Sequence, residues 1–558
     1  MISLKDRNLN AIKNGFPELY DRITKSNINP TDKRIKQIEL LETLKETSAI
    51  IIETNQGEIV RLNSAYDPEH EAIIWVQGQE GVLEKNLFLL GLGNGCFAKE
   101  LLKCRGENGR LLIYEPSIKV FMFVLEHYDL SVFFQTKGVR VIVEGINEDM
   151  FSGVMEEMLT LENYESKTFF VSPQIGRLFP ESRKRYVDGY MDGVGRLMSN
   201  KNTIRRFIHL LPYNQLHNLQ YLENNTVVPK LADVWDKEIP VIIIGAGPSL
   251  KEEIETLKKI QKRAYLFAVD SALPFLLQNE VVPDAYICIE ADKPMSFFED
   301  ERVNNIPLFT KLGTTHKLLD RHQGIKIFGY EDGVPEKVYE RYRVPVSQYR
   351  FGGNGATSFF AICKDLGVKN IILVGQDMAY SSDKVSHAGG RNEGYVEEER
   401  FVYESNTGGK VQSRQDWHRF VIWYENAIPV CEYEHVINTA AHGVKIKGTE
   451  YMPLSEAVDL YGKEHKDLEV IFENVEHTFN AKDRFFVKKF YENCMDELEE
   501  LVDIIRENPR DEKRKKSMLY ELLQQYEIAD LQKDFIESQK KGIEKIREYL
   551  LQCQKEVS

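Results

Sequence analysis

Glycine and polar residues follow a run of apolar residues in "VIIIGAGPSLKEE", which starts at Val241. Gly245 and Gly247 form a turn there, Pro248 suits the first turn of a helix, and Ser249 can cap the helix's free N–H groups. The N–H groups and the positive dipole end of such a helix can bind a phosphate. The stretch therefore predicts an anion-binding turn, with a tight strand-to-helix corner that binds nothing as the alternative.

Polar side chains also follow the next two predicted strands. Asp270 and Ser271 end the strand in "FAVDSALPFLLQ", and Glu290 and Asp292 end the strand in "CIEADKP". Because ligands of open parallel sheets bind at the carboxyl ends of the strands, we expect these groups beside the same site. The acidic pair also suggests that a divalent metal could bind there, although no metal site is assigned.

A third group lies in "RFGGNGATSFFAICKDLGVKNIILVGQDMAY". Gly352, Gly353 and Gly355 precede a helix that Thr357 and Ser358 open. That helix is expected to end at a left-handed cap on Gly367.

The strand that follows this helix ends at Asp377, and a long polar loop then carries His387. Asp377 could orient a neighbouring group or cap a turn. Because histidine titrates near neutral pH, His387 could act as a general base, or it could be an ordinary surface residue.

An earlier glycine turn, "LFLLGLGNGCFAKELL", contains Gly91, Gly93 and Gly95, and Glu115 ends the next predicted strand. A ribose-binding acid takes that place in dinucleotide-binding folds. Cys96 stands where the fingerprint has its last glycine. The GxGxG form resembles S-adenosylmethionine-binding turns, but nothing else in the sequence indicates methyl transfer. We therefore predict a scaffold descended from a nucleotide-binding turn.

Strands alternate with helices twice along the chain, which predicts an α/β fold with two Rossmann-like parallel-sheet domains and an all-helical C-terminal module. The expected segments are 1–54, helical and strand; 55–200, a Rossmann-like scaffold; 201–238, a helical connector; 239–455, the catalytic domain; and 456–558, a helical domain that could bind a partner. Within the first segment, apolar spacing predicts a helix over residues 32–48.

The charge and the cysteine content of the sequence exclude some classes of function. Lys plus Arg number 72 and Asp plus Glu 87, a net charge of −15, which argues against nucleic-acid and anionic-membrane partners. Seven cysteines without a CxxC pair are typical of reduced, buried thiols. Neither a signal peptide nor a membrane span is apparent, so a cytoplasmic location is expected.

Together, "GAGPSL", "AVDSALPFLL", "VPDAYICIEAD", "GGNGATSFFAICKDLGVKNIILVGQDMAY", "HAGG" and "VINTAAHGVKIKG" resemble the motility-associated factor (Maf) family of flagellin glycosyltransferases. The resemblance covers about Ile239 to Gly448. This core is also similar to bacterial sialyltransferases, which have a comparable glycine turn and a stretch matching Thr357 to Asp377.

The resemblance implies transfer of a nonulosonic acid, of pseudaminic, legionaminic or sialic acid type, from its CMP conjugate to Ser or Thr hydroxyls of flagellin. His387 would be the general base, with His442 in reserve, and Asp377 a second catalytic residue. The donor-binding residues would be Gly245, Gly247, Pro248, Ser249, Asp270, Ser271, Glu290, Asp292, Gly353, Asn354 and Thr357.

Two other functions stay open. The central domain also resembles archaeal pterin pyrophosphokinases, which would need ATP and Mg²⁺, with Glu290, Asp292 and Asp377 as ligands. The chain could instead be a non-catalytic flagellin-binding chaperone whose helical tail captures flagellin helices. Binding of CMP, of ATP or of neither would separate the three.

Overall fold

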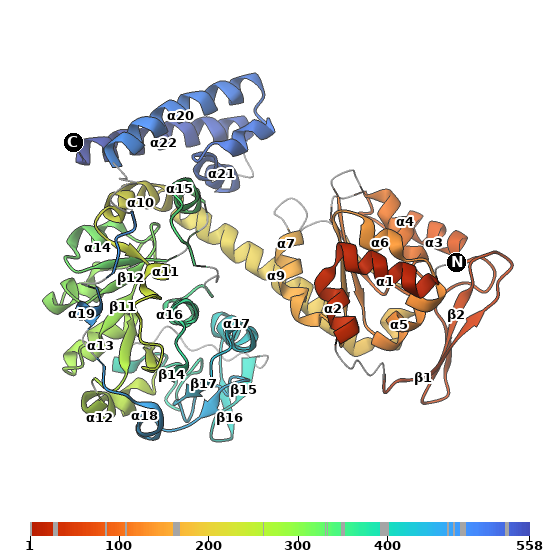
Figure 1. Ribbon diagram of the computed structural model, residues 1–558, viewed down its shortest axis with the longest axis horizontal. Helices are drawn as coiled ribbons and strands as arrows, with labels where there is room; N and C mark the ends of the chain where they lie inside the picture. Colours follow the sequence, from red (N-terminus) through yellow and green to blue (C-terminus); the bar gives the residue numbers. More distant parts are fainter. Residues whose placement is uncertain are drawn as a thin grey trace. The chain divides into compact units, whose positions relative to one another are not determined.

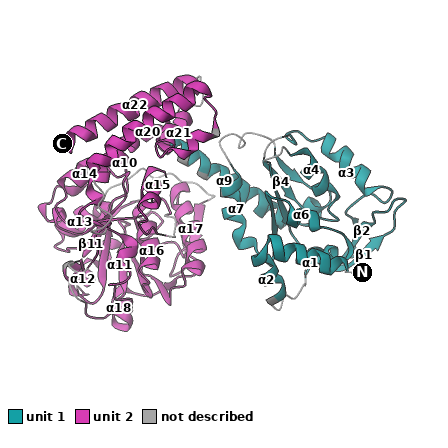
Figure 2. Cartoon of the chain, turned by 45° about the horizontal axis from the view of Figure 1, so that its top comes forward, with its two compact units in different colours: residues 1–202 teal, residues 203–558 magenta. Residues whose placement is uncertain are grey.

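The chain folds into two compact units, residues 1–202 and residues 203–558 (Figure 2). The computed structural model describes residues 3–25, 32–83, 86–105, 109–159, 168–260, 262–329, 331, 333–347, 352–390, 401–465, 468–472, 475–479, 487–529 and 535–557. Each unit has its own large apolar core. Among the described helices, none is long and apolar enough to cross a bilayer.

The first unit contains a four-stranded parallel sheet in the order β6-β5-β4-β7 and a three-stranded antiparallel sheet in the order β1-β2-β3. The strands are β1 Ile35–Leu41, β2 Ala49–Thr54, β3 Ile59–Arg61, β4 Asn86–Leu90, β5 Arg110–Glu115, β6 Val139–Val143 and β7 Phe169–Val171. The helices are α1 Leu4–Gly15, α2 Pro17–Lys25, α3 Pro68–Gln77, α4 Cys96–Cys104, α5 Ile118–His127, α6 Ser131–Gln135, α7 Phe151–Met158, α8 Ile175–Leu178 and α9 Pro180–Phe207, whose last turn lies in the second unit.

Strand β1 replaces the helix predicted over residues 32–48, so that prediction is wrong. β1 pairs antiparallel with β2, with Leu40 opposite Ile50 and Leu41 opposite Ala49. The run Ile50–Ile52 in β2 is rich in β-branched residues and exposes an edge that needs a partner. Hydrogen bonding to that edge stabilises a strand more than the helical spacing of the apolar residues stabilises a helix. Leu40 and Leu44 stay exposed.

The second unit is built on nine parallel strands in the order β18-β17-β14-β9-β10-β11-β12-β13-β8. Their bounds are β8 Thr226–Val227, β9 Val241–Ile244, β10 Tyr265–Val269, β11 Ala285–Ile287, β12 Leu308–Thr310, β13 Lys326–Phe328, β14 Asn370–Val374, β17 His435–Asn438 and β18 Glu450–Tyr451. From β9 to β13 the chain moves steadily to one side of β9, and it then returns to place β14 on the other side. The strand order therefore reverses between β14 and β9, which is where open parallel sheets bind ligands.

Helices and one hairpin complete the second unit. They are α10 Leu211–His217, α11 Val228–Leu231, α12 Leu250–Ile260, α13 Leu273–Gln278, α14 His316–Arg321, α15 Val334–Arg341, α16 Gly355–Asp365, α17 Gln415–Cys431, α18 Leu454–Tyr461 and α19 Leu468–Phe472, with the antiparallel strands β15 Val402–Glu404 and β16 Lys410–Gln412. Residues 391–400 of the long polar loop lie outside the described residues. The loop's far end forms the β15–β16 hairpin.

Three C-terminal helices, α20 Val487–Glu507, α21 Tyr520–Ala529 and α22 Phe535–Glu556, pack together and against α10 (Figure 1). Their apolar side chains belong to the same core as the nine-stranded sheet. The buried Tyr491 hydroxyl donates a hydrogen bond to the Leu216 carbonyl at 2.7 Å. The prediction of two parallel-sheet α/β units followed by C-terminal helices is thus confirmed, and none of the seven cysteines, all of which the structure describes, forms a disulfide.

Candidate active site

A cavity of about 160 Å³ opens where the strand order reverses. Its wall comes from the carboxyl ends of the neighbouring strands β14, β9, β10 and β11, from the start of α16 and from the first turns of α17. The sequence-predicted residues that line it are Gly245, Gly247, Pro248, Asp270, Ser271, Glu290, Asn354, Asp377 and His387. Ser249, Asp292, Gly353, Thr357 and His442 are not part of its lining.

The glycine turn after β9 packs directly against the end of β14. The Gly245 N–H donates to the Val374 carbonyl at 2.8 Å, and the Gly247 N–H donates to the Gly375 carbonyl at 2.9 Å. A Cβ on Gly245 would lie 2.5 Å from the Gly375 carbonyl oxygen, and one on Gly247 would lie 2.1 Å from Asp377 Oδ2. Glycine is needed here because two backbone turns meet, and their meeting forms one wall of the cavity.

Asp377 binds the N-terminal end of α12. Its Oδ1 accepts the Ser249 N–H at 3.2 Å and its Oδ2 accepts the Ser249 hydroxyl at 2.8 Å. The residue is 6% exposed. Burial raises the pKa of its carboxyl to about 6, although the hydrogen bonds from Ser249 act to lower it. Asp377 thus accepts hydrogen bonds from both the hydroxyl and the backbone N–H of Ser249. This N–H group was expected to face a phosphate.

Lys293 brings a buried positive charge into the cavity. Its Nζ lies 2.9 Å from Asp270 Oδ1 and 3.3 Å from Glu290 Oε1, and it sits 4.6 Å from the centre of the Phe297 ring. Burial lowers the pKa of this ammonium, but the two carboxylates raise it more, so the net pKa lies above its usual value. Sequence reasoning missed Lys293, although it directly follows the acidic residues of "CIEADKP".

The start of α16 forms the facing part of the wall. Asn354 is its N-cap: Asn354 Oδ1 accepts the Thr357 N–H at 2.8 Å, and the Asn354 N–H donates to Thr357 Oγ1 at 3.3 Å. This reciprocal capping box uses the hydroxyl of Thr357, which is fully buried. Gly353 takes a left-handed φ of +93°, and the predicted cap at Gly367 is present with φ +71°.

His387 is half-buried at the cavity wall. Its Nδ1 lies 2.8 Å from the hydroxyl of Ser386, which is buried and also lines the cavity. When Nδ1–H donates to that hydroxyl, the Nε2 atom carries the lone pair that a general base needs. His442 is exposed.

Two aromatic residues on α17, Trp417 and Phe420, complete the lining and were also missed. The Arg414 guanidinium lies 4.2 Å from the centre of the Trp417 ring, and the Tyr380 ring lies 4.8 Å from it. Their spacing of three residues puts both side chains on one face of the helix. That spacing in "QDWHRF" was the available signal.

The acidic residues suggested for Mg²⁺ are used separately. Glu290 is paired with Lys293, Asp377 holds Ser249, and Asp292 is exposed outside the cavity lining. Among the described residues, these three carboxylates do not form a group with the spacing of metal ligands.

The glycine turn of the first unit is packed with the protein's own groups. The fully buried Glu115 carboxylate accepts the Leu92 N–H at 2.8 Å and the Ser117 N–H at 3.2 Å, and burial raises its pKa to about 7. A Cβ on Gly91 would lie 2.8 Å from the Ile175 side chain, and one on Gly95 would lie 2.9 Å from Leu130. Glu115 thus binds the turn itself, as Asp377 does in the second unit.

Comparisons with known proteins give a fold for the whole chain. A family described as 6-hydroxymethylpterin diphosphokinase MptE-like matches residues 213–383. An uncharacterized protein of Treponema pallidum (strain Nichols) is 30% identical over 112 residues, which are 20% of this chain and 52% of that protein. The chain therefore spans about half the length of this curated relative.

A solved structure, the Maf glycosyltransferase from Magnetospirillum magneticum AMB-1, aligns with 99% of this chain and 95% of its own, with a TM-score of 0.54 and 15% identity. The MptE-like region runs from α10 past the end of β14, and so includes most of the cavity wall. The chain has the fold of this Maf glycosyltransferase over its full length, with an MptE-like region at its centre.

Proposed function

We propose that the chain is a glycosyltransferase that moves a nonulosonic acid of pseudaminic, legionaminic or sialic acid type from its CMP conjugate to Ser or Thr hydroxyls of flagellin. The observation that carries the proposal is the cavity at the strand-order reversal, which joins His387 to polar strand ends in a chain with the full-length fold of a Maf glycosyltransferase. The donor and acceptor follow from the resemblance of the sequence motifs.

The nucleotide would lie against the glycine turn and the start of α16. The Lys293 ammonium is the cationic donor proposed for the donor's phosphate, which would take the place of the exposed Glu290 carboxylate beside it. The ring of Trp417 offers an apolar surface for a base. Because Asp377 already binds the Ser249 N–H, we assign Asp377 to positioning the glycine turn, with no contact to the sugar.

In the transfer step, the acceptor hydroxyl oxygen bonds to the anomeric carbon, and the bond from that carbon to the CMP phosphate oxygen breaks. The hydroxyl proton passes to Nε2 of His387, and CMP leaves with the bonding electrons. Lys293 stabilises the negative charge that grows on the departing phosphate, while the sugar becomes oxocarbenium-like.

The MptE-like match favours a second candidate, a pterin diphosphokinase. Such an enzyme binds ATP with Mg²⁺, and the carboxylates suggested for that metal are engaged elsewhere or lie outside the cavity lining. We therefore rank it below glycosyl transfer, and the non-catalytic chaperone below both.

The test is the intact mass of flagellin coexpressed with this chain and a pathway that makes a CMP-nonulosonic acid. We expect flagellin to gain mass in steps of one sugar. His387→Ala should lower the rate of this modification at least about a hundredfold, because a general base contributes that much to the rate. His442→Ala is the matched control and should leave the modification intact.

Other results point elsewhere. Unmodified flagellin that co-purifies with the chain, with donor present, would favour the chaperone. Binding of ATP with Mg²⁺ in preference to CMP would favour the kinase. Full modification by His387→Ala would remove His387 as the base without excluding the transfer.

A further inference from the structure

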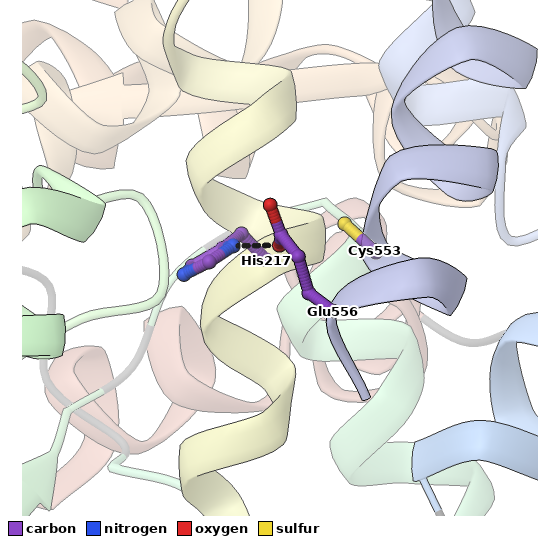
Figure 3. A group of neighbouring side chains, drawn as sticks. All are labelled: His217, Cys553 and Glu556. Carbon is purple, nitrogen blue, oxygen red and sulfur yellow. Dashed lines mark hydrogen bonds and ion pairs between the residues drawn. The ribbon is translucent and has the colours of Figure 1, made fainter. Parts of the chain in front are cut away.

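A second group of side chains with metal-ligand chemistry lies in the second unit, outside the cavity lining. His217 is the last residue of α10, and Cys553 and Glu556 lie three residues apart in the last turn of α22 (Figure 3). One nitrogen of His217, the Cys553 sulfur and a Glu556 carboxylate oxygen all lie within 4.8 Å of one another. His217 and Cys553 are buried, at 6% and 1% exposed, whereas Glu556 is open to solvent.

The other ring nitrogen of His217 is held by a carboxylate. His217 Nε2 lies 2.8 Å from Asp320 Oδ1, and the Tyr221 hydroxyl also donates to that oxygen. Metal-binding histidines have this arrangement, in which one N–H donates to a carboxylate and the opposite nitrogen keeps its lone pair. If His217 gives up its second proton to a metal, Asp320 would hold Nε2–H and leave the Nδ1 lone pair facing Glu556.

A cation is needed between His217 and Glu556. Nδ1 lies 2.8 Å from Glu556 Oε2, and with Nε2–H committed to Asp320 both of these atoms are hydrogen-bond acceptors. At this separation a proton fits between them, and a tetrahedral zinc ion would need Nδ1 and Oε2 to move apart by about half an ångström. A proton would not use the third donor, the Cys553 sulfur, whereas a metal that prefers nitrogen and sulfur ligands would.

We propose that His217 Nδ1, Cys553 Sγ and Glu556 Oε2 bind one zinc ion, which fastens the end of α22 to α10. Binding Zn²⁺ replaces the proton of His217 and the thiol proton of Cys553, so two protons are released. Neutral imidazole, thiolate and carboxylate then balance the two positive charges of the metal. The Tyr213 hydroxyl, 3.3 Å from Nδ1 and 3.2 Å from Glu556 Oε1, or a water can complete a tetrahedron.

Because the Cys553 thiol must lose its proton to bind zinc, the metal competes with that proton. Zinc affinity should therefore fall as the pH is lowered, as for other sites whose ligands must lose protons. The open side at Glu556 gives the ion a path from solvent.

The test uses the full chain, stripped with a chelator and titrated with zinc, and with cobalt(II) as an optical probe. We expect one zinc per chain, a thiolate-to-cobalt charge-transfer band, and d–d bands of tetrahedral intensity. Cys553→Ser should remove the charge-transfer band, while Cys104→Ser, at a half-buried cysteine of the first unit, should keep it.

Glu556 is exposed, so it can be replaced without disturbing the packing of the core. Glu556→Gln should weaken zinc binding at least about tenfold. Glu548→Gln, on the same helix, should not change it. The absence of stoichiometric zinc, a cobalt band that persists in Cys553→Ser, or unchanged zinc affinity in Glu556→Gln would each overturn the proposal and leave a protonated His217 between two carboxylates.

Discussion

At the scale of single residues, the carboxyl of Asp377 links the candidate site to pH. Burial raises its pKa from 3.8 to about 6 in the folded chain. The folded state therefore binds a proton more tightly than the unfolded state. The resulting stabilisation is fully present below about pH 4 and is lost as the pH rises through 6, which lowers the free energy of unfolding by about 3 kcal/mol.

Asp377→Asn should remove this part of the pH dependence, because an uncharged amide oxygen at the position of Oδ2 can accept both the Ser249 N–H and the Ser249 hydroxyl. We expect the variant to gain stability over the natural chain as the pH rises from 4 to 7, measured by denaturant unfolding of both proteins. Burial also raises the pKa of Glu115, but Glu115 is present in both proteins and cancels in the difference. A difference that is constant with pH would contradict the assignment.

The sequence located most of the cavity wall because a simple rule applies: polar residues that end neighbouring parallel strands share one sheet edge. Asp270, Glu290 and Asp377 follow that rule. The rule could not predict which partners these carboxylates take, because the ion pair of Lys293 and the hydrogen bonds of Ser249 depend on side-chain directions across separate loops. Trp417 was missed for the same reason, since α17 approaches the site from a distant part of the chain.

At the scale of elements, Thr357 at the start of α16 caps the helix and does not reach the cavity. Thr357 was expected to contact the donor, but its hydroxyl completes a capping box with Asn354 and the residue does not line the cavity. Thr357→Val should lower the free energy of unfolding by about 1 kcal/mol and leave CMP affinity within about twofold. Thr357→Ser, which keeps the hydroxyl, is the control. A large loss of CMP affinity at unchanged stability would make Thr357 a donor contact after all.

Strand β1 illustrates what local periodicity cannot predict. Residues 32–48 carry apolar side chains at helical spacing, but only Ile35 of the strand is fully buried. The strand forms because β2 offers an unpaired edge, and this is a tertiary influence that no window of β1 contains. Strands β9 to β14 are easier to predict from the sequence, because strands buried on both faces form continuous apolar runs.

At the scale of the whole molecule, the candidate site and the glycine turn after β4 belong to different units. Every residue of the cavity wall lies between Gly245 and Phe420, in the second unit, and that unit has its own core. In the first unit, the glycine turn is occupied by Glu115 and packed by Ile175 and Leu130. Nucleotide binding should therefore need only the second unit.

We expect residues 203–558, expressed alone, to bind CMP within about threefold of the full chain's affinity, and residues 1–202 to bind neither CMP nor S-adenosylmethionine. Isothermal titration calorimetry measures these three pairs and the full chain with CMP as the reference. Circular dichroism and a cooperative melt must first establish that each fragment is folded, because the division falls within helix α9. A folded second unit that binds CMP more than tenfold more weakly would mean that the first unit contributes to the donor site, and its glycine turn would then have to be reconsidered as more than a scaffold.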